Sequence, residues 1–205
     1  MNLNKISQIL ILGLGAVCLF AVSAQAAIAP FEMVRHRLIE VREQTKDVRV
    51  EATLTLTGEE LKEFRGGSLD YKAGESWTLG EVGGDGKLKI AGDGSSFDRL
   101  IWLMVLADDP IGKLGEWGVG VAPSETSVEV HGDDLVYRYG ESTRIWVSRD
   151  LSRLLRVQLV HGKHRWDASV TGTLEESWMP AMVTVTKDGR PFGVLRLVGV
   201  GASIR

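Results

Sequence analysis

The residue types best suited to chemistry are four histidines and the carboxylates near them. His161 and His164 lie close together in the chain, and Asp167 follows three residues later, so a metal site or a His/Asp pair must be considered. Further metal ligands would have to come from His36 or His131, in other segments. The sequence contains neither a His-x-x-x-His helix motif nor a carboxylate loop with calcium spacing. We therefore predict no bound metal and no cofactor.

Motifs for a catalytic nucleophile or a bound phosphate are also lacking. There is no Gly-x-Ser-x-Gly, and Ser95 and Ser96 stand where a helix could begin. The glycine-rich stretch 80–84 lacks the Lys-Ser/Thr pair of a phosphate-binding loop. We expect no catalytic residue and a protein that is not an enzyme. A hydrolase that uses His164 or Asp167 is the third-ranked alternative.

The composition is that of an ordinary globular protein. Of the 205 residues, 44% are hydrophobic and 25% are charged, which excludes a disordered or collagen-like chain. The net charge of -3 gives no basis for binding nucleic acid. A single cysteine excludes both a disulfide framework and a cysteine-based zinc or iron–sulfur site.

The first 26 residues have the pattern of a secretory signal peptide. Lys5 is their only charge, an apolar stretch follows from Ile9 to Val22, and Ala24-Gln25-Ala26 supplies small residues for cleavage. The alternative is an N-terminal membrane anchor that stays in place. We predict that residues 1–26 are removed and that residues 27–205 form a single periplasmic domain. Cys18 leaves with the signal, so the mature domain must be stabilised by its core.

The mature chain is predicted to begin with a helix and a long strand. The helix runs from Pro30 to about Glu43, and charged residues, Arg42 among them, cover its polar side. Apolar and polar residues then alternate from Val48 to Thr57, as in a strand with one buried face. The apolar positions of the helix follow spacings of three and four: Phe31, Val34, Leu38 and Val41.

Turn signals divide the remaining chain into short segments. Glycine-containing turns recur from Gly66-Gly67 to the stretch 187–190, at spacings of roughly 8–12 residues. The segments between them are rich in Val, Leu, Ile, Trp, Tyr and Thr. This pattern predicts about ten strands in an antiparallel meander, a sandwich or a partly closed barrel, and it argues against parallel β-α-β units.

Residues 95–117 interrupt the meander and are the most apolar part of the mature chain. Ser95 or Ser96 can cap a helix that reaches about Ala107, and this helix is too short to span a membrane. It is either a core helix wrapped by the sheet, or a lid over an apolar cavity with a mobile exit at Gly112 and Gly115. Apolar residues cover nearly its whole circumference: Phe97, Leu100, Ile101, Met104 and Val105 on one side, and Trp102, Leu103 and Leu106 on the other.

The last third of the chain carries a resemblance to a known family. The residues concerned are Leu135-Val136-Tyr137-Arg138-Tyr139, Arg144-Ile145-Trp146-Val147-Ser148-Arg149-Asp150, Leu154-Leu155-Arg156-Val157-Gln158-Leu159, Trp178-Met179-Pro180-Ala181-Met182-Val183-Thr184-Val185 and Lys187-Asp188-Gly189-Arg190. From Leu135 to Val200 the chain resembles the C-terminal half of the LolA/LolB-like periplasmic lipoprotein-localisation superfamily. An N-terminal helix before a long first strand, and an apolar helix inserted mid-chain, match the same plan.

This resemblance implies a mainly β, α+β fold: a curved antiparallel half-barrel with an N-terminal helix and an inserted helical lid. The concave face and the lid would enclose a cavity for acyl chains, without catalytic residues or a cofactor. Carriers of the family that close their lid have an Arg-Pro pair after the second strand, and the arginine holds the lid shut. Here the stretch 67–77 contains Trp77 but no Arg-Pro pair.

We therefore predict a periplasmic carrier or binding protein that shelters the acyl chains of a lipid or lipoprotein and contributes to outer-membrane lipoprotein sorting. Its partners would be a lipid or lipid-modified protein and an envelope protein, and we expect a monomer. The alternative is a non-enzymatic protein-interaction module of an envelope complex. The residues expected to line the cavity come from the sheet and the inserted helix: Leu54, Leu56, Leu69, Tyr71, Trp77, Phe97, Leu100, Ile101, Met104, Val105, Trp146 and Trp166.

Overall fold

The computed structural model describes residues 28–44, 49–58, 61–70, 74–122, 124–131, 134–175 and 177–199. The predicted signal peptide therefore lies outside the described residues. So does Tyr71, one of the residues predicted to line the cavity, and of Leu69 only the backbone is described.

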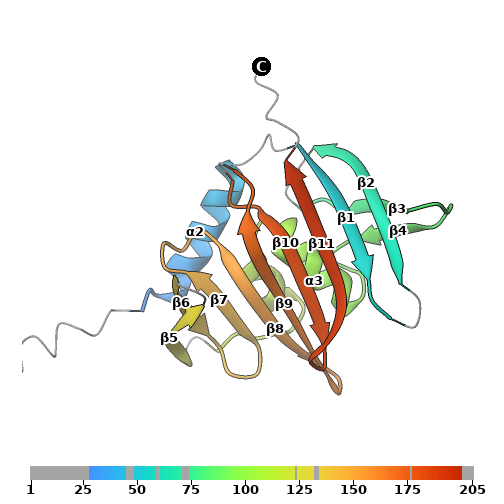
Figure 1. Cartoon of the computed structure of the whole chain (residues 1–205). Coiled ribbons are helices and arrows are strands. Elements are labelled where there is room, and N and C mark those ends of the chain that lie inside the picture. The colour runs from blue at the N-terminus through green and yellow to red at the C-terminus, as the bar shows by residue number, and fades with distance from the viewer. Residues whose placement is uncertain are drawn as a thin grey trace, which may run out of the picture.

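The described strands form one antiparallel sheet of 11 strands in the order β4-β3-β2-β1-β11-β10-β9-β8-β7-β6-β5 (Figure 1). All neighbours except β1 and β11 follow one another in the chain, as in a meander. The strands are β1 (Arg49–Leu56), β2 (Lys62–Asp70), β3 (Trp77–Glu81), β4 (Lys87–Ile90), β5 (Thr126–His131), β6 (Asp134–Tyr139), β7 (Arg144–Ser148), β8 (Leu154–His161), β9 (His164–Thr173), β10 (Pro180–Lys187) and β11 (Arg190–Gly199).

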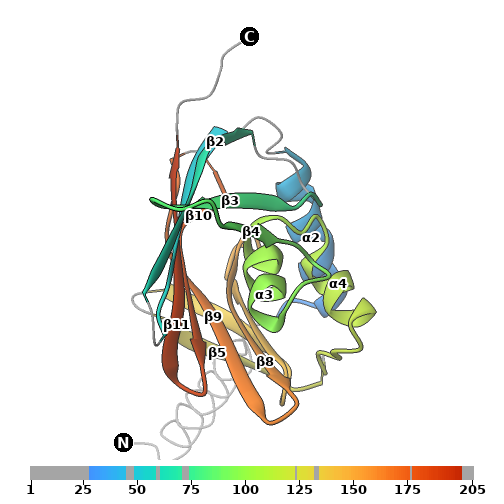
Figure 2. The same cartoon turned by 90° about the vertical axis from the view of Figure 1, so that its right-hand side faces the viewer.

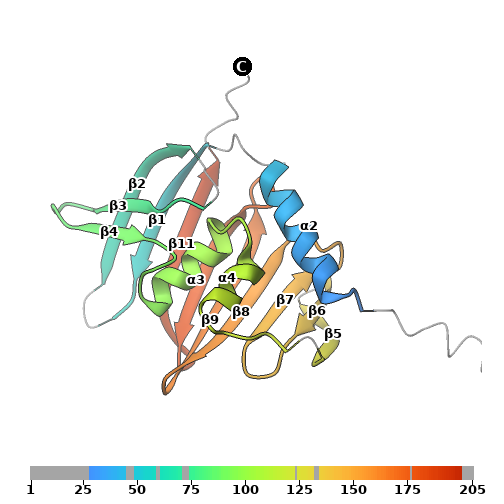
Figure 3. The same ribbon diagram turned by 180° about the vertical axis from the view of Figure 1, so that it is seen from behind.

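Three described helices, α2 (Phe31–Gln44), α3 (Ser96–Val105) and α4 (Pro110–Glu116), lie on the same face of this curved sheet (Figures 2 and 3). The chain leaves the sheet after the edge strand β4 and returns at the opposite edge, β5. Because α3 and α4 connect these two edges, they cross the concave side of the sheet. Among the described residues, no helix is long and apolar enough to cross a membrane.

The main core lies between the helices and the concave face. Buried residues alternate along the central strands, as at Leu195 and Leu197 of β11, because successive strand side chains point to opposite faces. A second, small cluster consists of Val136, Trp146 and Leu155. Ile145 and Val147, on either side of Trp146 in β7, belong to the main core. Because successive side chains of a strand point to opposite faces, Trp146 points away from that core. The small cluster therefore lies on the convex face.

The predicted fold class is confirmed: the structure is a curved, open antiparallel sheet with an N-terminal helix and an inserted mid-chain helix. The lid alternative for the inserted helix included a mobile exit at Gly112 and Gly115. These residues belong to the helix α4, whose N-cap Asp109 accepts a hydrogen bond from the Gly112 amide at 2.8 Å. Pro110 in the first turn favours the same start.

Candidate lipid-binding site

The inserted helix α3 is buried around nearly its whole circumference. Its N-terminus is closed by a capping box, in which Ser95 and Asp98 each accept a hydrogen bond from the backbone of the other. The helix therefore needs no polar partner from the sheet at its first turn. Seven of its ten residues are buried: Phe97, Leu100, Ile101, Trp102, Leu103, Met104 and Val105.

The inner side of α3 packs on β8, β9 and β10. At its N-terminal end the Phe97 ring lies 5.1 Å from the ring of Phe192, which in turn lies 5.0 Å from Trp166, edge-on. Gly193 makes room for this aromatic group, since a Cβ atom at that position would lie only 2.9 Å from the Phe97 ring. The contact between α3 and the sheet is therefore apolar and tightly fitted.

The outer side of α3 is covered by α4 and by the connections of β3 and β4. The Trp102 ring lies 6.2 Å from that of Trp117, and its Nε1 donates a hydrogen bond to the Glu75 carbonyl at 2.9 Å. The ring also lies against Gly92, where an added Cβ would approach it to 3.2 Å. In this structure α3 is therefore part of the core, in a closed arrangement.

The C-terminal end of α3 is held by Arg42 of α2. Its Nη1 donates hydrogen bonds to the carbonyls of Leu103, at 3.1 Å, and Ala107, and its Nη2 donates to the carbonyl of Met104 at 3.4 Å. The guanidinium lies 4.3 Å from the ring centre of Trp178 and is only 2% exposed. The last carbonyls of a helix have no partner within the helix and attract a cation, so Arg42 stabilises this end of α3.

A second arginine of α2 binds the start of α4. Arg35 donates two hydrogen bonds to Asp109 Oδ2, from Nε at 2.9 Å and from Nη2 at 2.6 Å. This pair is partly exposed, so it contributes less than a buried contact would. Arg35 and Arg42 are seven residues apart and so lie on the same face of α2, and both attach this helix to the α3–α4 segment.

The sequence-based placement of Arg42 on the polar side of its helix is wrong. Arg42 is buried on the same stripe as Val34 and Leu38. The spacing of four residues from Val34 to Leu38 to Arg42 was the available signal, because positions i, i+4 and i+8 share a helix face. An arginine on an apolar stripe indicates a buried acceptor for its charge.

The structure places nine of the twelve predicted cavity-lining residues in the main core or against it. They come from three strands and from the helix itself: Leu54 and Leu56 of β1, Trp77 of β3, Trp166 of β9, and Phe97, Leu100, Ile101, Met104 and Val105 of α3.

Trp146 does not join this group. It lies in the convex-face cluster, where its Nε1 donates to Glu129 at 2.7 Å and the Arg156 guanidinium lies 4.5 Å from its ring centre. The alternating pattern of β7 allowed either face for this residue. The surrounding strands decide it, because Ile145 and Val147 occupy the concave side.

The histidines do not form a site with Asp167. His164 Nδ1 lies 2.7 Å from Asp188 Oδ2, and His161 Nδ1 shares a hydrogen bond of 2.6 Å with Ser96 Oγ. Asp167 instead accepts hydrogen bonds from Arg156 Nε, at 2.9 Å, and from the amide of Gln158. Within the described part of the chain, no three residues of the His, Cys, Asp and Glu types are grouped as metal ligands would be.

The protein is therefore a half-barrel in which apolar side chains fill the space between the concave face of the sheet and the helices. No protein-family model and no curated protein matches the chain.

Two solved structures are similar to it in the path of the backbone. One is a LolA superfamily protein of Nitrosomonas europaea, 9% identical, with a TM-score of 0.47 over 83% of this chain and 92% of that one. The other is a DUF1329 family protein of Desulfovibrio piger, 11% identical, with a TM-score of 0.48 over 85% of this chain and 94% of that one. Likeness at this level says nothing about a ligand or an activity.

Proposed function

We propose that this protein is an exported carrier or binding protein that shelters acyl chains between α3 and the concave face of the sheet. The observation that supports this proposal is the apolar character of α3 on every side. A helix that only covers a core needs one apolar stripe, whereas α3 buries seven of its ten residues. A helix of this kind can leave the sheet only if another apolar group takes its place.

Acyl chains meet that requirement. Burying one is favourable by about 0.8 kcal/mol per CH₂, so a chain of about 16 carbons would gain roughly 12 kcal/mol. This gain would replace the apolar contacts that α3 loses with the sheet. In this proposal, loading requires that the α3–α4 segment moves away from the concave face.

In this proposal Arg42 controls the opening. Moving α3 would break the hydrogen bonds from Arg42 to the carbonyls of Leu103, Met104 and Ala107. An arginine left without these acceptors in an apolar site costs several kcal/mol, which favours the closed form. Arg42 thus supplies a closing contact in a chain that has no Arg-Pro pair after its second strand, where LolA-like carriers have theirs.

The cargo in this proposal is a lipid or a lipid-modified protein in the periplasm. The signal-peptide pattern of residues 1–26 supports export. The finer role is delivery of lipoproteins to the outer membrane, in which the protein part of the cargo would stay in solvent while its acyl chains lie beneath α3.

The test is uptake of a photoreactive fatty acid by protein purified without denaturation and then delipidated. We expect saturable uptake, competition by an unlabelled fatty acid, and photolabelled peptides from α3, β9 and β10. Trp146 on the convex face serves as the internal control and should stay unlabelled. Protein that carries no lipid when natively purified, and takes up no fatty acid, would contradict the proposal.

A protein-interaction module is the second candidate, supported by the edge strand β5. Val130 is 72% exposed, and its cross-strand partner Leu135 is 46% exposed. An open edge with exposed apolar residues can accept a strand from a partner. A Val130→Lys, Leu135→Lys variant should lose a captured envelope partner if this candidate is correct, and fatty-acid uptake should then be absent from the wild-type protein as well.

A further inference from the structure

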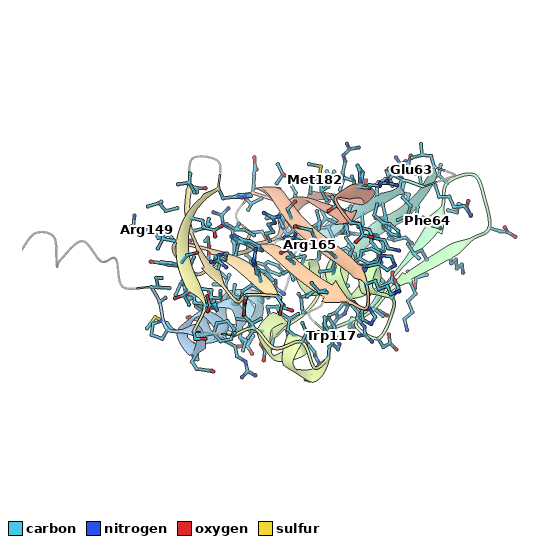
Figure 4. All side chains as sticks on the ribbon, turned by 90° about the horizontal axis from the view of Figure 1, so that it is seen from below. Glu63, Phe64, Trp117, Arg149, Arg165 and Met182 are labelled. Carbon is cyan, nitrogen blue, oxygen red and sulfur yellow. The ribbon has the colours of Figure 1, made fainter. Side chains whose placement is uncertain are left out.

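Two hairpin turns lie side by side at one end of the sheet. The first joins β8 to β9 and comprises residues 161–165, and the second joins β10 to β11 and comprises residues 187–190. We call these nine residues the hairpin end. Figure 4 looks onto this end of the molecule, with Arg165 labelled near its middle.

Hydrogen bonds through Asp188 fix the two turns to each other. The Asp188 amide donates to the Arg165 carbonyl at 2.8 Å, and the Asp188 carboxylate accepts from the Arg165 amide at 2.9 Å. His164 Nδ1 lies 2.7 Å from the same carboxylate. The turn itself is well defined, since Asp188 and Gly189 both have positive φ, as a type I′ hairpin turn requires. The hairpin end is therefore one rigid surface.

This surface is basic on a chain whose net charge is -3. It carries Lys163, Arg165, Lys187 and Arg190 against the single carboxylate of Asp188. Among the described residues, no carboxylate lies within ion-pair distance of Lys163 or Arg190. Both side chains are exposed, so their charges face solvent.

Just behind these turns, the convex face has a hollow of about 530 Å³. Its lining includes two cations, Arg156 and Arg165, and two carboxylates, Asp167 and Asp188. Since Arg156 is bound by Asp167 and the charges balance, the hollow is a poor pocket for a single anion. The excess positive charge lies at the tips of the turns, which suits an extended anionic surface better.

On its concave side the hairpin end adjoins the apolar core. Lys187 Nζ lies 5.2 Å from the ring centre of Trp166, which contacts Phe192 and, through it, Phe97 of α3. His161 of the first turn is hydrogen-bonded to Ser96 at the N-terminus of α3. Lys187 therefore lies next to a row of aromatic rings that extends from β9 to α3.

We propose that the hairpin end docks the protein onto a membrane surface of anionic phospholipids, with the lipid phosphates against the exposed tip residues Lys163 and Arg190. This inference rests on the proposed function, because it places the proposed acyl site near the lipid surface. Basic residues close to an anionic bilayer each strengthen binding by about fivefold at physiological salt. The attraction is screened over about 10 Å at 0.1 M salt, so it acts only once the tips are near the headgroups.

The experiment is co-sedimentation of the natively purified protein with vesicles of phosphatidylglycerol and phosphatidylcholine, compared with vesicles of phosphatidylcholine alone. We expect binding to the anionic vesicles only, and its loss at high salt. A Lys163→Gln, Arg190→Gln variant should bind these vesicles about 25-fold more weakly, at about fivefold per charge. Both substitutions lie on exposed turn residues, and circular dichroism verifies that the fold is kept.

The matched control is Lys87→Gln, Lys89→Gln, which removes the same charge from two exposed residues of β4 at the sheet edge. This variant should bind anionic vesicles like the wild type. The proposal is overturned if the wild type binds neither kind of vesicle, or if both variants lose binding equally. It is also overturned if the hairpin variant binds anionic vesicles like the wild type and loses only the binding of an acidic protein partner. Fatty-acid uptake measured without vesicles reports on the acyl site separately, so either proposal can fail alone.

Discussion

At the scale of single residues, Arg42 has the largest consequence. It joins α2 to the C-terminal carbonyls of α3 across 61 to 65 sequence positions, from a site that is almost fully buried. A planar guanidinium can donate to several carbonyls at once, which an ammonium cannot do in the same geometry. Arg42 therefore stabilises the observed contact between α2 and α3, and under the proposed function it would also set the ease of opening.

We predict that Arg42→Met lowers the free energy of unfolding by about 3 kcal/mol, because charge-assisted hydrogen bonds contribute about 1.5–3 kcal/mol. The same variant should take up fatty acid faster, since methionine keeps much of the side-chain volume without holding α3. Urea unfolding and stopped-flow uptake measure the two effects. Arg37→Met is the control: Arg37 lies on the same helix, is exposed and forms an ion pair with Glu40 on the helix surface, so both quantities should hardly change. Slower uptake by Arg42→Met would contradict the closing role.

Tyr139 makes a second residue-scale prediction. Its hydroxyl donates to the Ala29 carbonyl at 2.7 Å, and its ring lies 5.4 Å from Phe31. Burial raises the pKa of Tyr139 from 10.0 to about 12, with a smaller contribution from Tyr137. The folded chain therefore holds this proton more tightly than the unfolded chain does. The resulting stability is complete below pH 10 and is lost as the pH rises towards 12.

Tyr139→Phe should lower the free energy of unfolding by about 1 kcal/mol at neutral pH, the usual effect of losing one hydrogen bond. It should also flatten the loss of stability between pH 10 and 12. Urea unfolding across this range measures both. Parallel curves for the wild type and Tyr139→Phe would show that another group causes the alkaline loss.

At the scale of elements, the fit of α3 on the sheet depends on Gly193 of β11. An added Cβ would approach the Phe97 ring to 2.9 Å and Leu56 to 3.2 Å. Overpacking of this kind usually costs about 1–3 kcal/mol. We predict that Gly193→Val destabilises the protein by this amount and that Phe97→Leu in the same chain restores part of the loss.

Thermal or urea unfolding of the single and double variants measures this coupling. Gly199→Val is a matched control, because Gly199 lies in the same strand with open space where its Cβ would be. It should have little effect. If Phe97→Leu restores nothing to Gly193→Val, the contact between α3 and β11 is not what limits the substitution.

At the scale of the whole molecule, an acyl site beneath α3 must couple ligand binding to folding. A ligand that binds only the folded chain stabilises it by about 2.7 kcal/mol at a hundred times its dissociation constant. We predict that excess fatty acid raises the thermal midpoint of the delipidated protein in proportion to the logarithm of its concentration. Scanning calorimetry measures the shift. A midpoint that is independent of fatty acid would exclude the interior as a binding site.

The local elements were predictable because their patterns repeat within a few residues. Spacings of three and four predicted the helix now seen as α2, and alternation predicted β1, each within a residue or two of its observed ends. The apolar run after Ser95 predicted α3, and the capping serine was recognised. The resemblance in the last third led to the curved half-barrel with its inserted helix, which the structure confirms.

The sequence by itself thus determined most of the elements, though not α4, together with their order and the apolar excess of α3. Only the tertiary structure decided which strand face is concave, which moved Trp146 to the convex side. It also showed that α3 is packed on both sides in the closed form, and that Arg42 binds carbonyls more than 60 positions away. The physical reason is the distance along the chain over which each feature is decided. Periodicity depends on residues close in the sequence. Which face of a strand is concave, and which group binds a buried charge, depend on residues that only folding brings together.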